Sequence, residues 1–238
     1  MWQIKRFFPC IFLFSFSPVF ADEPNLSPFE ATYKLYSSGA EIGVVQRTFT
    51  ESDNNEYIYR SDSHTTGIAS VFRKDHIVEE SRWKFADNQF YPLDYSYQKK
   101  GGKEDRDVSM HFDWDKNIII NRVNDRTRET QLQSGVLDKL LYQYAIMHDL
   151  QIGNFPNSYT IVDGGKIKTY NFERLGEETI HTPLGDLHTI KVIRHKPNDK
   201  RKSIFWCAPK FQYLPVQVEH TEEDGFVTTA IIQSLSGL

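Results

Sequence analysis

Residues 29–35 read Phe29-Glu30-Ala31-Thr32-Tyr33-Lys34-Leu35, and this stretch decides the fold. Apolar and polar side chains alternate along it with a period of two, which predicts a β-strand with one buried face and one solvated face. The Ser-Ser-Gly sequence at 37–39 is typical of a turn, and a second apolar run follows at 42–49. Two such runs joined by a short turn predict an antiparallel hairpin.

The same pattern continues along the next eighty residues. Val108, Met110, Phe112 and Trp114 mark one face of a strand most clearly. Further strands are expected at 57–63, 77–85, 91–97, 106–114 and 118–123. Because the turn signals between them are short, a meander of neighbouring antiparallel strands is the simplest topology.

One segment, residues 134–150, shows helical rather than strand periodicity. Its apolar residues recur at helical spacing: Val136, Leu137, Leu140, Leu141, Tyr144 and Met147. Ser134 can cap the start, and Gly153 lies just past the end. Ile146 and Leu150 widen the apolar stripe, so we expect the helix to be largely buried, against a concave sheet face or across an opening.

The last third of the chain returns to strands joined by hairpin turns. Turns are expected at 163–166, where Gly164 and Gly165 supply positive φ angles, and at 183–186, 197–200 and 224–225. About a dozen strands with one principal α-helix predict a mainly β fold, a curved antiparallel sheet or open β-barrel, because so long a sheet tends to curl. No composition break divides residues 22–238, so we expect a single domain.

The first residues predict export. Lys5 and Arg6 precede an apolar run at 7–20, and Val19 and Ala21 fit the positions before a cleavage site. Residues 1–21 are therefore interpreted as a signal peptide, with the mature protein beginning at Asp22. An uncleaved membrane tether is the alternative, but the run is shorter than the roughly 20 apolar residues of a membrane span. No second run approaches that length, so no membrane span is expected after cleavage.

Composition limits the possible partners and the source of stability. Cys10 leaves with the signal peptide, so Cys207 is the one mature cysteine and an internal disulfide is excluded. Removing Lys5 and Arg6 from the 28 Lys and Arg residues leaves 26 against 32 Asp and Glu residues. This acidic balance argues against nonspecific binding to nucleic acid or to an anionic membrane surface.

The order of several short motifs resembles a known family. The segments are 137–141 (LDKLL), 162–166 (VDGGK), 174–178 (RLGEE), 182–187 (TPLGDL), 204–209 (IFWCAP) and 214–216 (LPV). Together they resemble the bacterial exported family catalogued as domain of unknown function 3108. Typical members carry an apolar residue where this chain has Cys207. The resemblance implies a β-rich fold and a periplasmic location, and it brings no activity and no catalytic residues.

No motif in the sequence specifies a reaction. There is no Gly-x-Ser-x-Gly elbow, no Gly-rich phosphate loop before a helix and no His-Glu-x-x-His helix. A four-residue turn at 183–186 would place His181 opposite His188, but a metal site needs a further ligand. Cys207 has apolar neighbours, which favours an inert thiol. We therefore expect no metal, no cofactor and no catalytic residue, and an enzyme is the third hypothesis.

Aromatic residues on alternating strand positions leave two functional hypotheses. The first is a noncatalytic envelope protein that binds a hydrophobic ligand or lipid in its curved sheet. Leu141, Tyr144 and Met147 are then the expected ligand-binding residues, because they lie on adjacent turns of the main helical stripe. The alternative is an interaction or assembly protein that holds an envelope partner through its sheet surface and loops.

Overall fold

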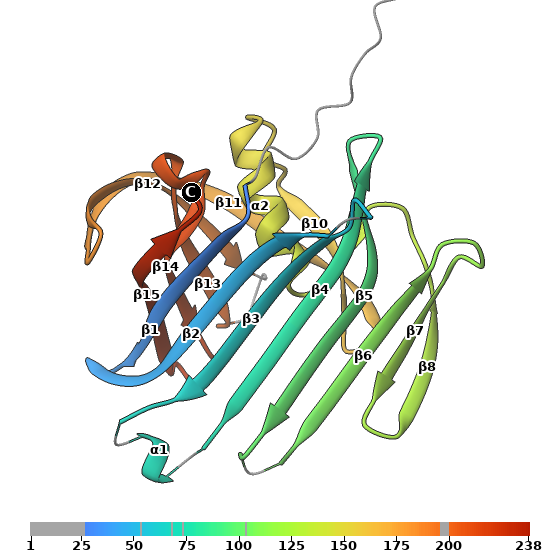
Figure 1. Ribbon diagram of the computed structural model, residues 1–238, viewed down its shortest axis with the longest axis horizontal. Coiled ribbons are helices and arrows are strands. Elements are labelled where there is room, and N and C mark those ends of the chain that lie inside the picture. Colours follow the sequence, from blue (N-terminus) through green and yellow to red (C-terminus); the bar gives the residue numbers. More distant parts are fainter. Residues whose placement is uncertain (1–26, 53, 68, 73, 103, 196–199) are drawn as a thin grey trace, which may run out of the picture.

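The computed structural model describes residues 27–52, 54–67, 69–72, 74–102, 104–195 and 200–238 (Figure 1). Within them, fifteen strands form one sheet. The signal peptide predicted at 1–21, its cleavage site and most of the turn predicted at 197–200 lie outside the described residues. No helix in the described part of the chain has the length and apolar character needed to cross a bilayer.

The strands fall into two halves of the sequence. The first half comprises β1 (Phe29–Ser37), β2 (Ala40–Glu51), β3 (Tyr57–Thr65), β4 (His76–Ala86), β5 (Gln89–Lys100), β6 (Arg106–Asp113), β7 (Ile118–Val123) and β8 (Arg126–Gln131). The second half comprises β9 (Val136–Leu137), β10 (Ser158–Asp163), β11 (Lys166–Thr182), β12 (Gly185–His195), β13 (Lys202–Ala208), β14 (Leu214–Thr221) and β15 (Val227–Ser236). The helices are α1 (Ala69–Phe72), α2 (Leu141–Gln151) and the single-turn η1 (Pro209–Phe211).

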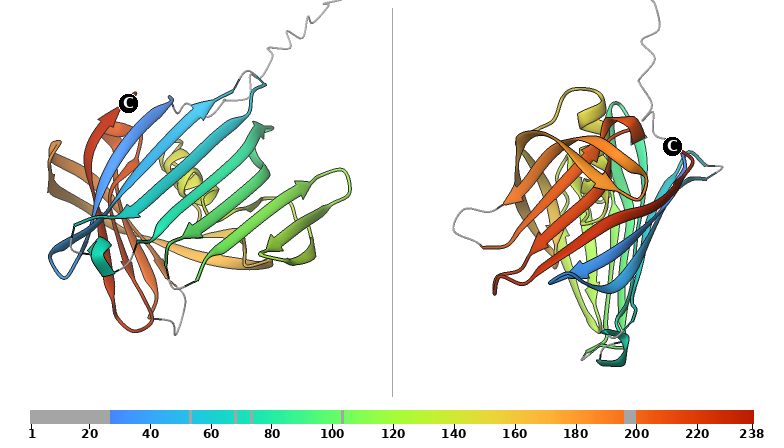
Figure 2. Two further views of the ribbon diagram at one scale, coloured as in Figure 1. Left: turned by 60° about the horizontal axis from the view of Figure 1, so that its bottom comes forward. Right: turned by 90° about the vertical axis from the view of Figure 1, so that its left-hand side faces the viewer.

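The sheet consists of two meanders, and the first strand of the chain, β1, lies in the interior of the sheet between them. β1 pairs with both β2 and β15, and from there each half runs outward strand by strand to β8 at one end and β9 at the other. All neighbours are antiparallel except β9, which pairs in parallel with β10. The expected β-rich, curved antiparallel sheet is confirmed, with more strands than the dozen predicted. The sheet curls around α2 without closing into a continuous barrel (Figures 1 and 2).

The end of the curled sheet at β8 contacts the β10–β11 turn through a side chain. The Thr130 hydroxyl, on β8, donates a hydrogen bond to the carbonyl of Gly165 at 3.0 Å. Gly165 has a φ of +70°, and a Cβ on it would lie 2.6 Å from Nδ2 of Asn121 on β7. This approach between the β10–β11 turn and the far end of the sheet therefore requires glycine.

The helix begins later than its apolar pattern predicts. Val136 and Leu137 form β9, and the carboxylate of Asp138 accepts hydrogen bonds from the backbone N–H groups of Leu140 and Leu141, each at 2.8 Å. The prediction that Ser134 caps a helix at 134–150 was wrong at its start. Strand and turn residues here are buried like the helical ones, so spacing alone did not separate them.

One predicted hairpin turn differs from the structure, whereas two others agree with it. The turns at 163–166 and 224–225 join β10 to β11 and β14 to β15 as expected. The turn predicted at 183–186 contains only two residues, because Thr182 pairs with Gly185. His181 consequently faces Asp186 instead of His188, and the predicted pairing of the two histidines was wrong. The described residues contain no cluster of three metal-ligating side chains.

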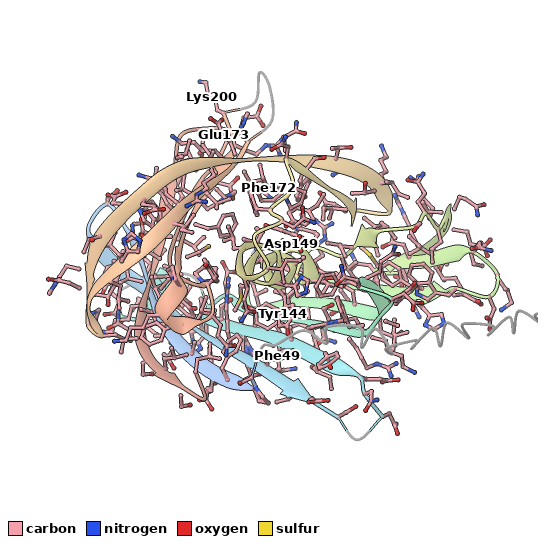
Figure 3. The ribbon with its side chains drawn as sticks, turned by 90° about the horizontal axis from the view of Figure 1, so that it is seen from above. Phe49, Tyr144, Asp149, Phe172, Glu173 and Lys200 are labelled. Carbon is pink, nitrogen blue, oxygen red and sulfur yellow. The ribbon has the colours of Figure 1, made fainter. Side chains whose placement is uncertain are left out.

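The core lies on the concave side of the sheet, around α2. Tyr144 of α2 contacts Phe49 and Trp83, with ring centroids 4.6 and 4.9 Å apart. On the other side of the helix, Tyr142 contacts Phe172 of β11 at 5.8 Å. Figure 3 shows α2 lying between Phe49 and Phe172, so aromatic rings from both halves of the sheet pack against the same helix.

Candidate functional site

The three predicted ligand-binding residues all lie in this core. Leu141 and Met147 are fully buried on α2, and so is Tyr144. The Tyr144 hydroxyl and the Trp83 indole nitrogen have no hydrogen-bond partner among the residues the structure describes. An unpaired buried hydroxyl lowers stability, so a phenylalanine at position 144 would stabilise this cluster better if packing were its only role. Whether a ligand reaches these three residues stays a prediction.

Asp138 is a carboxylate buried in the same interior. Besides the two backbone N–H groups of α2, it accepts a hydrogen bond from the Ser81 hydroxyl on β4 at 2.6 Å. Burial raises the pKa of Asp138 to about 6, although these hydrogen bonds oppose the shift. The carboxylate thus fixes the start of α2 against the sheet and titrates in a mildly acidic range.

The first sheet half contributes a half-buried cation to the interior, Arg47 on β2. Its guanidinium donates to the Tyr59 hydroxyl at 3.3 Å and lies 5.4 Å from the centroid of the Tyr33 ring. Burial by itself would lower the pKa of Arg47, but the neighbouring tyrosine hydroxyls raise it above its ordinary value. Arg47 therefore remains a cation inside the curled sheet.

The second half contributes a matching cation, Arg194 on β12. The register pairs Arg194 with Phe172, so both side chains lie on the concave face. The guanidinium carbon lies 4.7 Å from the centroid of the Tyr170 ring, and Tyr170 meets Tyr142 of α2 edge to face at 5.6 Å. Arg194 is thus held by aromatic rings, in the manner of a cation–π contact.

A pocket of about 300 Å³ opens beside Arg194, at the rim of the concave face. It lies where β10 and β12 end and β11 begins, and it is lined by Asp163, Lys168, Thr169, Tyr170, Arg194, His195 and Arg201. We call it the Arg194 pocket. Its volume is at the lower limit for small-molecule sites, which are typically about 300 to 1,000 Å³.

Asp163 is the one carboxylate of this lining, and it already has partners. It accepts hydrogen bonds from Lys168 Nζ at 2.6 Å and from the Tyr170 hydroxyl at 3.1 Å, and Lys139 Nζ lies 3.8 Å away. Burial would raise the pKa of Asp163, but Lys168 and Lys139 hold it below the ordinary value. Asp163 therefore orients Tyr170 and neutralises the lysines.

A hydrogen-bonded row crosses the strands next to Arg194. The Ser203 hydroxyl lies 2.9 Å from Nδ1 of His220, and Nε2 of His220 lies 3.3 Å from a Glu222 oxygen. Burial, with the charge of Arg194, lowers the pKa of His220, so its ring is neutral at pH 7. Hydrolases use the same residue types. Here Ser203 is 5 % exposed and is not part of the pocket lining, so the row orients His220 beside Arg194.

Cys207 lies in the apolar surroundings that its sequence neighbours indicated. It is fully buried, and burial raises the pKa of the thiol. The adjacent Trp206 is also buried, and its indole N–H donates to Glu178 at 3.0 Å. Neither residue lines the Arg194 pocket.

The sequence reasoning missed Arg194 and Tyr170. The available signal was their position along the strands. Arg194 is two residues from Val192 and Tyr170 is two residues from Phe172, so each pair lies on the same face of its strand. A charged residue on the buried face of a strand is uncommon and indicates a paired charge or a functional site.

Comparison with known proteins identifies a family and a fold. The family model described as "Protein of unknown function (DUF3108)" matches residues 29–231. No curated protein matches the sequence. A β-barrel-like protein of the DUF1849 family from Brucella abortus shares the fold, with a TM-score of 0.58 and 10% identity over 90% of this chain and 98% of that chain.

Two further solved structures align over much of the chain with lower scores. One is provisionally described as a lipoprotein from Parabacteroides distasonis, with a TM-score of 0.35 and 11% identity over 90% of this chain and 97% of that chain. The other is provisionally described as an exported protein with a YmcC-like fold from Bacteroides fragilis, with a TM-score of 0.39 and 12% identity over 90% and 97%.

Proposed function

The chain belongs to the DUF3108 family, whose function is unknown, and we propose that it is a noncatalytic envelope protein that binds a lipid or another hydrophobic ligand within its curled sheet. The observation that carries the proposal is the Arg194 pocket, which opens at the rim of the concave face and has Tyr170 in its wall. Tyr170 touches Tyr142 of α2, so the pocket borders the aromatic interior around the helix.

The proposal explains why the sheet surrounds a helix without closing. An open sheet leaves a rim through which an apolar chain can enter, and ligand sites of β-barrels lie at such mouths. In this proposal the apolar chain passes Tyr170 and Tyr142 and lies along α2, next to Leu141, Tyr144 and Met147. The unpaired Tyr144 hydroxyl supports this placement, because a polar atom of a ligand would satisfy it.

A location in the periplasm is part of the same proposal. It rests on the basic and apolar pattern of residues 1–21, which is typical of a signal peptide. A soluble binding protein in that compartment would protect an apolar molecule from water between two membranes. N-terminal sequencing of the exported form tests the location, and a chain that begins at Met1 would contradict cleavage after Ala21.

The ligand itself is tested by mass spectrometry and by probe uptake. Protein purified natively from the cell envelope should carry a co-purified apolar molecule, and the emptied protein should take up an apolar fluorescent dye. Leu141→Trp should reduce dye uptake several-fold, because the larger ring occupies the space beside α2. Leu175→Trp is the matched control, since Leu175 is exposed on β11.

An envelope interaction or assembly protein is the alternative, and the same experiment separates the two. If the native protein carries no apolar molecule and takes up no dye, lipid binding is wrong and the assembly function takes its place. The charged edge strand β8, with Arg126, Arg128 and Glu129, does not favour pairing with another strand, because charged edges oppose it.

A further inference from the structure

Within the part of the chain that the structure describes, Arg194 has no carboxylate partner, which distinguishes it from Lys168 and Lys139. Lys168 and Lys139 both interact with Asp163. Among the described residues, no carboxylate forms an ion pair with Arg194, whose neighbours are Tyr170, Tyr142 and His220. A half-buried guanidinium without a counter-charge is unfavourable unless an anion neutralises it.

The position of the Tyr170 ring leaves hydrogen-bond donors of Arg194 available. A guanidinium over an aromatic ring uses its flat face for that contact, while its five N–H donors lie in its plane. Fork-like pairs of such donors match the oxygens of phosphate and carboxylate groups. Arg194 is therefore anchored in a way that suits it to bind an oxyanion in the adjoining pocket.

The lining suits an anion whose oxygens can meet more than one donor. Lys168 is matched by Asp163, whereas Arg194 adds a positive charge that no carboxylate of the lining matches. A phosphate group fits this arrangement, because its oxygens can accept from the guanidinium fork and from a neighbouring cation at once, and a monoester carries close to two negative charges at neutral pH.

From these observations we propose that the Arg194 pocket binds a phosphate group, the head group of an anionic lipid whose tail lies along α2. The tail rests on the proposed function, whereas the phosphate site depends only on Arg194 and its pocket. Free phosphate offers the same chemistry, so the two sources are separated by the experiment.

The test compares three probes on the full mature chain: palmitoyl glycerol phosphate, neutral palmitoyl glycerol and inorganic phosphate. Binding is measured by displacement of an apolar fluorescent dye and by titration calorimetry, below the concentration at which either lipid forms micelles. We expect the phosphate lipid to bind about tenfold more tightly than the neutral lipid, as one lost pair of charge-assisted hydrogen bonds would give. Added salt should weaken this preference.

Two variants assign the preference to the pocket. Arg194→Gln should abolish the preference for the phosphate lipid over the neutral lipid, and Arg194→Lys should retain part of that preference, because the charge remains without the fork geometry. Lys116→Gln is the control, since Lys116 lies exposed in the β6–β7 turn. Circular dichroism and thermal unfolding confirm that each variant is folded.

Each result has a distinct meaning. If Arg194→Gln and Arg194→Lys both keep the full preference, or if the two lipids bind equally, the phosphate site is wrong while lipid binding stands. If inorganic phosphate binds in an Arg194-dependent way and neither lipid binds, the site takes a free anion, and both the lipid head group and the proposed function are wrong. If nothing binds, both proposals fall.

Discussion

Replacing Asp138 by Asn tests the electrostatics at the start of α2. The Asn side chain keeps an oxygen that accepts from Leu140 and Leu141, and its amide can donate to the Ser81 oxygen, so the geometry is preserved. The substitution therefore removes the ionisable proton and little else. Asp138→Ala, by contrast, leaves these buried groups unpaired and should cost at least about 2 kcal/mol.

The expected effect follows from the raised pKa. The pKa of Asp138 is about 6 in the folded protein, against an ordinary value of 3.8 for an aspartate. Between these values the folded chain holds a proton that the unfolded chain has released, so the free energy of unfolding falls as pH rises. A shift of about two units corresponds to about 3 kcal/mol, at about 1.4 kcal/mol per unit. The free energy of unfolding of the wild-type protein, measured relative to that of Asp138→Asn, should therefore fall by about this amount between pH 4 and pH 7.

Urea unfolding followed by tryptophan fluorescence at several pH values gives this difference. Asp115→Asn is the matched control, because Asp115 is exposed in the β6–β7 turn and its variant should follow wild type at every pH. A difference for Asp138→Asn that stays flat, or that grows with rising pH, would show that hydrogen bonding outweighs burial and would refute the argument.

Three further substitutions test the packing. Tyr144→Phe removes an unpaired buried hydroxyl and should leave the ligand-free protein as stable or up to about 1 kcal/mol more stable in urea; a loss of more than that would reveal a hidden partner. Gly165→Ala should destabilise by about 1 to 2 kcal/mol more than Gly164→Ala in thermal unfolding, because both have positive φ but only Gly165 approaches Asn121; equal losses would contradict that contact. Trp206→Ala should cost about 3 to 5 kcal/mol in urea, and a cost under about 1 kcal/mol would show that the indole is exposed.

Strands were predictable from the sequence where one face is buried and the other is solvated. The range 118–123 agrees with β7 at both ends, and most other strands extend the predicted ranges by one to three residues. β8 was missed because its sequence, Arg-Thr-Arg-Glu-Thr-Gln, is polar on both faces at the end of the sheet. An edge strand of this kind carries no period-two signal.

The site was harder to predict because its members are distant in sequence. Tyr142 and Arg194 meet because α2 packs back onto the concave face of the strands that follow it, where Arg194 lies opposite Phe172. No local sequence pattern encodes that packing. The helix start was missed for a different reason, since the burial of Val136 and Leu137 in β9 resembles the buried stripe of a helix.

Helix stability and the proposed binding site are physically connected through Tyr142. The pKa of Tyr142 is raised by burial, while Arg194 and Arg47, from opposite halves of the sheet, both act to lower it. Tyr142 directly follows Leu141, whose backbone N–H is held by Asp138. The carboxylate that fixes the start of α2 therefore also helps to place the Tyr142 ring, on which both cations act. It follows that a change at the helix start alters the electrostatic environment of Arg194 without touching the pocket, which is why the phosphate site and the Asp138 titration should be measured on the same variants.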